Sequence, residues 1–271
     1  MRTLFRRLPT TVVPKVGSYL GRLVGRFAGE TNRRIEARTL NTLGVQLGAE
    51  EVWSDLGRRA AEFIVADRLI DSVALSPNAA HTYQSAVDEN RGVLCATAHL
   101  GHWELMAAAL SSWGYPFSAI SARPKSGPIS DLLDQHRSML KIQTLTPGGG
   151  GREAIRRLTM GETVTVFIDQ STNERSRPIP FLGHDAPTSL TYERLLRTSE
   201  AVPLFIWNHR NELGRYIVEV ERVPEDDALG WVTERLEQLV RAYPTQWVWI
   251  HDRWTDRVSR TAPQNKVPSL V

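Results

Sequence analysis

The 271-residue chain lacks several features that would assign it to a specialised protein class. It has a single cysteine, Cys95, so no internal disulfide can form, and the apolar residues around it predict a buried structural thiol. No window of about 20 residues is apolar enough to span a bilayer. Prolines and basic residues interrupt the N-terminal region, which does not fit a signal peptide. With 41% apolar and 23% charged residues and no internal repeat, the chain is expected to be globular.

Positive charge is concentrated near the N-terminus. Residues 1–39 hold nine Lys or Arg and two acids, a net charge of +7, whereas the whole chain carries +3. Apolar residues recur with a helical period over residues 12–27, and Lys15, Arg22 and Arg26 lie between them. Such a basic amphipathic helix is typical of an anionic membrane surface, but also of a helix that packs on its own domain. Both interpretations stay open, and we expect a peripheral protein that faces the cytoplasm.

The order of the expected elements indicates an α/β fold. Helical patterns fill residues 11–74, and strands then alternate with helices from about residue 90. The expected strands are residues 93–97, 117–121, 142–146, 163–168, 204–207 and 216–223, and the expected helices are residues 103–113, 129–140, 152–159, 190–199 and 229–242. This alternation predicts a mixed, largely parallel sheet flanked by helices. We expect one domain, residues 1–271, with an N-terminal helical segment (1–75), a catalytic core (90–260) and a functional loop (170–187).

A histidine and an acid follow the first expected strand of the core. His99 precedes Glu104 by five residues, and an imidazole beside a carboxylate can remove a proton from a hydroxyl. On a regular helix these side chains would point about 140° apart. They can meet if His99 lies in the turn after the strand and Glu104 in the first helical turn. Asp169 follows another expected strand, so it should lie at the same sheet edge as His99.

Other residues are candidates for binding anions or metals. Arg123 and Arg137 have the planar donors that suit phosphate, although either could form a surface ion pair instead. The glycines at 148–151 precede an expected helix, where a flexible turn is favoured over an anion site. The histidines are scattered through the chain, so we expect no metal site.

Five segments form a pattern that extends over nearly the whole chain. In order, they are residues 99–104 (HLGHWE), 122–124 (ARP) with Arg137 further on, 161–170 (ending in Asp-Gln), 179–183 (IPFLG) and 244–254 (PTQWVWIHDRW). Together they resemble the bacterial lipid A biosynthesis acyltransferase family, the lauroyl and myristoyl transferases, and the related acyltransferases of mannosylated phosphatidylinositol. Two positions depart from the family pattern: His102 stands where Asn is usual, and Leu182 replaces an aromatic residue.

The resemblance implies a glycerolipid acyltransferase-like fold and a specific reaction. A fatty acyl group would move from an acyl thioester, of acyl carrier protein or CoA, to a hydroxyl of a lipid or glycolipid acceptor similar to a lipid A precursor. His99 would be the general base and Glu104 would orient it, with no cofactor beyond the thioester cosubstrate. The implied partners are the acyl donor, the acceptor and an anionic membrane surface, and the implied location is the cytoplasmic face of the inner membrane, with peripheral or monotopic attachment. The implied substrate-binding residues are Arg123, Arg137, Asp169, Gln170, Phe181, Gly183 and Arg253.

Some alternatives stay open. His99 could activate water in a thioester hydrolase, or the chain could be a non-catalytic lipid-binding protein with the same fold. Trp247, Trp249 and Trp254 could anchor the chain at a membrane interface, but packing in the core is favoured. An acyl chain also needs an apolar tunnel, for which we expect Phe167, Phe181, Leu182 and the tryptophans as lining.

Overall fold

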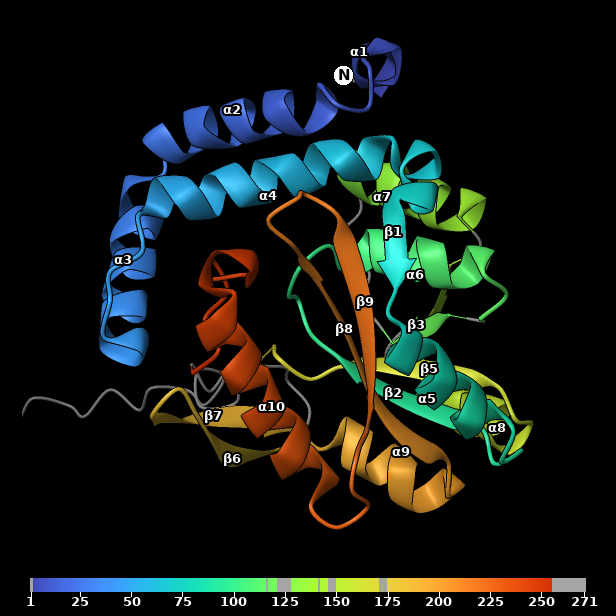
Figure 1. Cartoon of the computed structure of the whole chain (residues 1–271). Coiled ribbons are helices and arrows are strands. Elements are labelled where there is room, and N and C mark those ends of the chain that lie inside the picture. Colours follow the sequence, from blue (N-terminus) through green and yellow to red (C-terminus); the bar gives the residue numbers. More distant parts are fainter. Residues whose placement is uncertain are drawn as a thin grey trace, which may run out of the picture.

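The computed structural model describes residues 2–115, 117–120, 128–140, 142–145, 150–170 and 175–254. Its centre is a seven-stranded sheet in the order β1-β9-β8-β2-β5-β3-β4 (Figure 1). The strands are β1 (Val73–Leu75), β2 (Val93–Thr97), β3 (Ser118–Ile120), β4 (Gln143–Leu145), β5 (Thr163–Phe167), β8 (Val202–Arg210) and β9 (Tyr216–Arg222). Strands β8, β2, β5, β3 and β4 are parallel, while β9 runs antiparallel to β8 and parallel to β1. The predicted mixed, largely parallel α/β fold is confirmed.

Helices cover both faces of this sheet, which is why the central strand β2 is buried over its whole length. Leu94 and Ala96 belong to the core on one face, and Val93 and Cys95 to the core on the other. The helices after β1 are α5 (Pro77–Val87), α6 (Trp103–Ser112), α7 (Pro128–Met139), α8 (Gly150–Thr159), α9 (Thr191–Ser199) and α10 (Ala228–Ala242). Cys95 is a buried free thiol, as predicted, and burial raises its pKa to about 12.

The N-terminal segment is helical up to Ile64. It consists of α1 (Arg2–Arg7), α2 (Val13–Arg26), α3 (Gly29–Leu43) and α4 (Ala49–Ile64), followed by two short 3₁₀ turns. Helix α2 lies along α4 (Figure 1). They approach closely because Gly17, Gly21 and Gly25 face α4, where a Cβ on Gly21 would overlap the Trp53 carbonyl group. Within the described ranges, no helix has the length and apolar character needed to cross a membrane.

The prediction of a loop over residues 170–187 is wrong. Strands β6 (Ser176–Phe181) and β7 (His184–Ser189) form an antiparallel hairpin there. Three prolines obscured these strands in the sequence, but a two-stranded ribbon has edges on which proline needs no hydrogen-bonding partner. The turn between the strands has positive φ at Leu182 (52°) and Gly183 (82°), which matches the twist of a tight hairpin. Helix α5 and strand β1 were also not predicted.

Candidate active site

The sheet register places His99 beside Asp169. Strands β2 and β5 are parallel neighbours, with Thr97 opposite Phe167. His99 and Asp169 each stand two residues beyond this pair, at the carboxyl end of their strand. The prediction that both residues lie at one edge of the sheet is therefore confirmed.

Asp169 contacts His99 through both carboxylate oxygens. Its Oδ1 lies 2.8 Å from His99 Nδ1, and its Oδ2 accepts the backbone N–H of His99 at 2.7 Å and the indole N–H of Trp247 at 3.0 Å. The carboxyl group is 2% exposed. Burial by itself would raise its pKa, but charge on His99 and the hydrogen bonds from His99 and Trp247 outweigh burial and lower the pKa below its ordinary value. An ionised Asp169 at neutral pH follows.

The His99 ring is held by aromatic neighbours and by a polar group at its other nitrogen. The ring centroid lies 4.4 Å from that of Phe167 and 4.9 Å from that of Trp103, which meets it edge-on. Nε2 lies 3.3 Å from the side-chain Nε2 of Gln170. Because Nδ1–H can donate to Asp169, a neutral ring would carry its lone pair on Nε2, beside an amide that can donate to it. The structure thus brings Asp169 and Gln170, both predicted site residues, to the two nitrogens of His99.

Glu104 lies in the first turn of α6, as predicted, but its carboxylate does not contact His99. It forms an ion pair with Arg137 of α7, whose Nε lies 3.3 Å from Oε2 and whose Nη2 is also close to Oε1. The prediction that Glu104 orients His99 is corrected by this geometry, in which Asp169 takes that position. The physical reason is that His99 turns across the sheet edge to β5, whereas α6 directs Glu104 toward α7.

The same ion pair changes the interpretation of Arg137. Burial would lower the pKa of its guanidinium, but the hydrogen bond from Arg137 to Glu104 and the charge of Glu104 raise it. The charge predicted to bind phosphate is thus neutralised within the protein. The ion pair borders a cleft of only about 10 Å³. Trp103 and Phe167 also line this cleft, and both contact the His99 ring. The other lining residues are Ala107, Phe117, Ala119, Ile142 and Thr144.

Backbone contacts from distant parts of the chain hold the loop between His99 and α6. The N–H of Gly101 donates to the carbonyl oxygen of Gln246 at 3.0 Å, and the N–H of His102 donates to Asn208 Oδ1 at 2.8 Å. Gly101 has a φ of 61°, and a Cβ there would overlap the Asn208 backbone. Only glycine fits this position, because it combines a left-handed backbone with close approach to another strand. No motif in the sequence pointed to Asn208.

His102, the departure from the family pattern, caps helix α6. Its Nδ1 accepts the backbone N–H of Leu105 at 3.2 Å, which satisfies one of the free donors at the start of the helix. An Asn side chain can accept the same bond, so histidine can replace it here. The ring is 3% exposed, and burial, together with the charges of Arg59 and Arg58, lowers the pKa of His102 well below its ordinary value.

The C-terminal tryptophans belong to the core, as favoured from the sequence. Trp247 is 1% exposed and Trp249 is fully buried. Leu100 forms an isolated β-bridge with Trp247, which brings this segment to the loop after His99. The C-terminal segment therefore contacts the site twice: Gln246 accepts the N–H of Gly101, and Trp247 donates to Asp169.

Two of the predicted substrate-binding residues are buried instead. Phe181 is fully buried against Trp247 and Trp254, so the expectation that it contacts substrate or lines a tunnel is not met. Arg253 is 1% exposed, and its guanidinium donates to the carbonyl of Pro187 and, at 2.6 Å, to Thr188 Oγ1. Burial lowers the pKa of Arg253 to about 10, and its bonds join the C-terminal segment to β7.

The remaining predicted positions are Gly183, Arg123 and the glycines at 148–151. Gly183 is exposed at the tip of the β6–β7 hairpin. Arg123 and residues 148 and 149 lie outside the described residues. In the part of the chain that the structure covers, no three His, Cys, Asp or Glu side chains converge in a way that could hold a metal.

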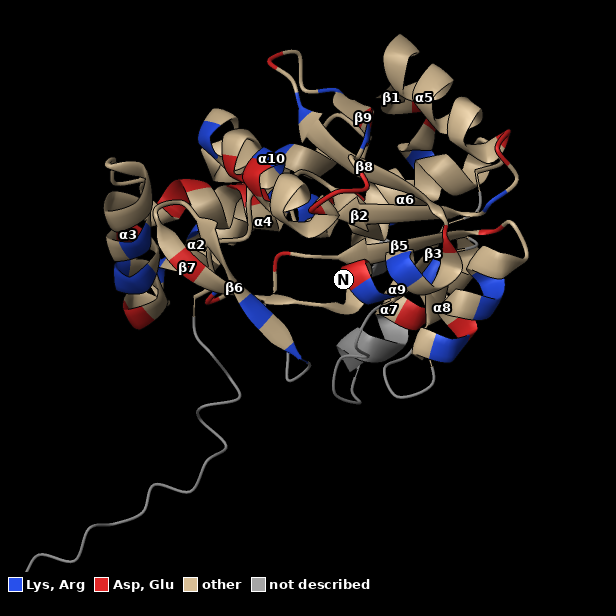
Figure 2. Ribbon diagram, turned by 90° about the horizontal axis from the view of Figure 1, so that it is seen from below, with Lys and Arg blue, Asp and Glu red and all other residues tan. Residues whose placement is uncertain are grey.

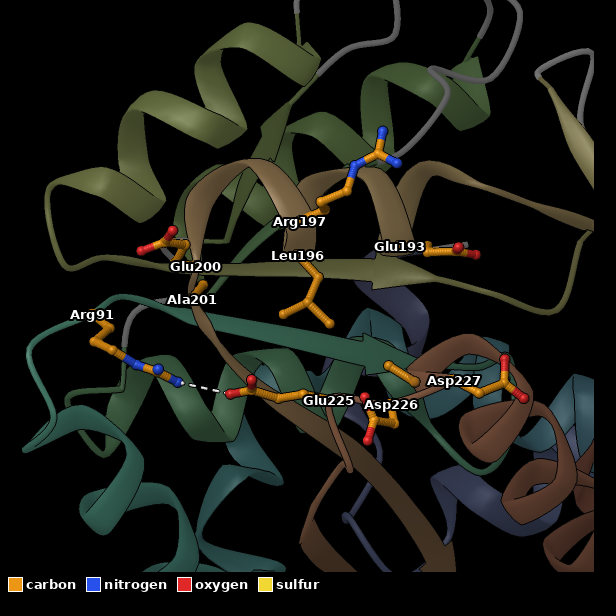
Figure 3. Close-up of a pocket in the computed structure, with 10 residues that line it drawn as sticks. Arg91, Glu193, Leu196, Arg197, Glu200, Ala201, Glu225, Asp226 and Asp227 are labelled. Carbon is orange, nitrogen blue, oxygen red and sulfur yellow. Dashed lines mark hydrogen bonds and ion pairs between the residues drawn. The ribbon is translucent and has the colours of Figure 1, made fainter.

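A separate cavity of about 530 Å³ lies at the opposite end of the strands (Figure 3). Arg91 and Ala201, which precede β2 and β8, belong to its wall. Five acids also line it, but several are paired: Arg91 with Glu225, and Arg177, from outside the lining, with Glu193 and Asp227. The amino ends of the strands are the wrong edge for chemistry at His99.

The structure is thus an α/β protein whose largely parallel sheet carries an imidazole and a carboxylate in contact at its carboxyl edge. Residues 1–256 match the bacterial lipid A biosynthesis acyltransferase family, and the chain belongs to that family. It is similar to the phosphatidylinositol mannoside acyltransferase of Mycolicibacterium smegmatis, with 23% identity over 184 residues that cover 63% of this chain and 59% of that enzyme. The chain thus matches less than two thirds of that relative's length.

A solved structure gives a weaker likeness. The 1-acyl-sn-glycerophosphate acyltransferase PlsC of Thermotoga maritima matches with a TM-score of 0.39 and 14% identity, covering 87% of this chain and 99% of that one. The family and both relatives are acyltransferases.

Proposed function

We propose that the protein transfers a fatty acyl group from an acyl thioester to a hydroxyl of a lipid or glycolipid, with His99 as general base and Asp169 as the residue that orients it. The observation that carries this proposal is the Asp169–His99 contact of 2.8 Å at the sheet edge. It fixes a proton on Nδ1 and leaves Nε2 as the acceptor for a substrate proton. Family membership supports acyl transfer as the reaction that uses this base.

The acceptor hydroxyl would replace the Gln170 amide at Nε2 of His99. As the hydroxyl oxygen attacks the thioester carbonyl, its proton passes to Nε2, and Asp169 stabilises the imidazolium that forms. The tetrahedral intermediate then collapses, the carbon–sulfur bond breaks, and Nε2 returns the proton to the departing thiolate. The products are the acylated lipid and a free thiol. No covalent enzyme intermediate is required, because the thioester is already activated.

An assay with a defined acyl donor and acceptor tests the proposed reaction. Purified protein is incubated with acyl-CoA or acyl carrier protein thioester, with and without a lipid A precursor or a phosphatidylinositol mannoside, and products are measured by mass spectrometry. We expect acyl-lipid that depends on the acceptor and is lost in a His99→Gln variant. Fatty acid release at the full rate without acceptor would instead establish the hydrolase, and binding without turnover would establish a lipid-binding protein.

A membrane-facing role of helix α2 is part of the proposal. Its glycines pack against α4, so the large apolar side chains point outward, and Phe27, Tyr19 and Val24 are 85%, 66% and 57% exposed. An apolar groove of about 420 Å³ runs between α2 and α4. Exposed bases on α2 include Lys15, Arg22 and Arg26, and those on α3 include Arg33 and Arg34. Figure 2 shows basic bands, together with acidic ones, on α3.

Exposed apolar groups flanked by cations fit the interface of an anionic bilayer. We therefore propose peripheral attachment to the inner membrane through α2. Flotation with anionic vesicles at low salt tests the attachment. If the protein binds neutral and anionic vesicles equally, the basic residues do not contribute to membrane binding.

A further inference from the structure

A group of buried ionisable side chains connects helix α4 to the loop after His99. Asp55, Arg58, Arg59 and Glu62 are 8%, 7%, 4% and 3% exposed, although all four lie on one N-terminal helix. Burying four such groups is costly unless they are paired. Pairs are indeed present: Arg58 and Arg59 both contact Asp55, and Arg58 also lies 3.6 Å from Glu62.

Arg59 also contacts the loop between His99 and α6, outside this group. Its Nη1 donates to the carbonyl oxygen of Gly101 at 2.6 Å, while its Nε lies 2.7 Å from Asp55 Oδ2. The guanidinium carbon lies 5.2 Å from the centroid of the Trp103 ring. The Trp103 ring in turn forms a T-shaped contact with the ring of His99. A cation over an aromatic ring is attracted to the ring face, and this attraction restricts the orientation of the ring.

The burial of Arg59 is not explained by stability alone. Burial lowers the pKa of its guanidinium to about 10, so the group remains charged at neutral pH, and the buried Nη2 has no partner among the described residues. An apolar side chain of similar volume would avoid that desolvation cost. What an apolar side chain would not supply is the bond to Gly101, the residue whose left-handed backbone turns the loop.

We propose that Arg59 is a positioning residue for the reaction: it fixes the Gly101 carbonyl and the Trp103 ring, and thereby holds the His99 imidazole in place against Asp169. This inference rests on the proposed role of His99 as the base. It makes the N-terminal helical segment a part of the active site as well as the carrier of the membrane-facing helix. Misplacing a catalytic group by about 1 Å can cost about a hundredfold in rate.

Arg58 provides a matched control on the same helix. It is buried to a similar degree and also pairs with Asp55, but its other contacts are Glu62 on its own helix and the hydroxyl of Tyr216 on β9, and not the backbone of the loop after His99. The Arg58→Met and Arg59→Met variants both remove a buried guanidinium and leave Asp55 with one partner. A difference between them in turnover therefore reports the contact with the loop.

The experiment compares Arg59→Met, Arg59→Lys and Arg58→Met by thermal unfolding, kcat, KM and the nitrogen NMR spectrum of the histidine rings, with the His99 signals identified as those missing in His99→Gln. We expect Arg59→Met to lower kcat about 10- to 100-fold with KM within about twofold. Arg59→Lys should recover part of kcat, because it keeps the charge without the planar stack. Arg58→Met should lose similar stability and keep kcat within about twofold.

The NMR readout separates this proposal from the proposed function. In wild-type protein we expect the Nδ1–H tautomer at His99, and in folded Arg59→Met exchange broadening or a mixture of tautomers, whether or not any acyl transfer is detected. An unchanged His99 spectrum in that variant would overturn the positioning role, as would equal losses of kcat in the two methionine variants. If Arg59→Met does not fold, the same measurements of kcat and of the His99 spectrum are compared between Arg59→Lys and Arg58→Lys. Absence of transfer by the wild type, with the expected spectra, would instead overturn only the proposed reaction.

Discussion

Asp169 holds His99 at two points, with one carboxylate oxygen 2.8 Å from the ring Nδ1 and the other accepting the backbone N–H at 2.7 Å. Two bonds from one buried carboxylate fix both the rotation of the imidazole and the position of its Cα. A neutral ring then has one favoured tautomer, with Nε2 facing the Gln170 amide instead of the carboxylate. This relationship, rather than the spacing of His99 and Glu104 along the chain, determines which acid contacts the proposed base.

The first prediction distinguishes the two acids. In Asp169→Asn, the amide would donate to Nδ1 and move the ring proton to Nε2, where it blocks proton abstraction. We expect kcat to fall about a hundredfold or more. In Glu104→Gln, the contact with Arg137 is weakened while His99 keeps its partner, and we expect less than about a tenfold loss. Steady-state kinetics on both variants checks this, and a larger loss for Glu104→Gln would restore Glu104 as the orienting acid.

The sequence predicted the edge of the sheet correctly but not the pairing at that edge. Strand ends are visible as a change of pattern, so His99 and Asp169 could both be assigned to the carboxyl edge. Which acid contacts His99 depends on strand order, and the adjacency of β2 and β5 has no signal in the chain. Glu104 is close in sequence, but the start of α6 at Trp103 directs its side chain to α7.

Buried polar residues were the other limit of sequence reasoning. Neither Arg59 nor Asn208 was singled out from the sequence, because a charge or an amide inside a core is recognised only when its partner is known. Arg253 and Phe181 were assigned to substrate for a related reason. A family pattern marks residues that matter, but it does not separate those that support the site from those that touch the ligand.

A second prediction concerns Trp247, whose indole N–H donates to Asp169 at 3.0 Å. Trp247→Phe removes a hydrogen bond to a buried charge, which typically contributes about 1.5–3 kcal/mol, and we expect kcat to fall several-fold because the carboxylate is less well fixed. Trp249→Phe is the control, since its indole donates to a neutral carbonyl, that of Pro244. Urea unfolding and kinetics should show a smaller stability loss for Trp249→Phe and no change in kcat. Equal effects of the two variants on kcat would argue against a specific role of Trp247.

A third prediction concerns the contact of α2 with α4. A Cβ on Gly21 would overlap the Trp53 backbone, so we expect Gly21→Ala to cost about 1–3 kcal/mol of the free energy of unfolding and to weaken binding to anionic vesicles. Gly29→Ala is matched to it, because no atom lies within 4 Å of a Cβ at that position. Denaturant unfolding and vesicle flotation on the two variants check the expectation. If Gly21→Ala binds the vesicles as wild type does, the packing of α2 on α4 does not control membrane attachment.

The last prediction follows from the buried ring of His102, which faces Glu62 at 3.9 Å, Tyr216 at 5.5 Å between ring centroids, and the charges of Arg58 and Arg59. Its pKa in the folded protein lies well below the ordinary value of 6.5, so below that pH the unfolded chain binds a proton that the folded chain does not. Folding stability therefore decreases as the pH falls below 6.5, by up to about 1.4 kcal/mol per pH unit.

An Asn at position 102 can still cap α6, but it does not titrate. We therefore expect His102→Asn to resemble wild type at pH 8 and to lose less stability than wild type between pH 6.5 and 5, as measured by urea unfolding across that range. Titration of Glu62 and the other carboxylates occurs in both proteins and cancels in the difference between the two curves. Parallel curves would contradict the prediction, since they would mean that His102 takes up its proton equally in the folded and unfolded states.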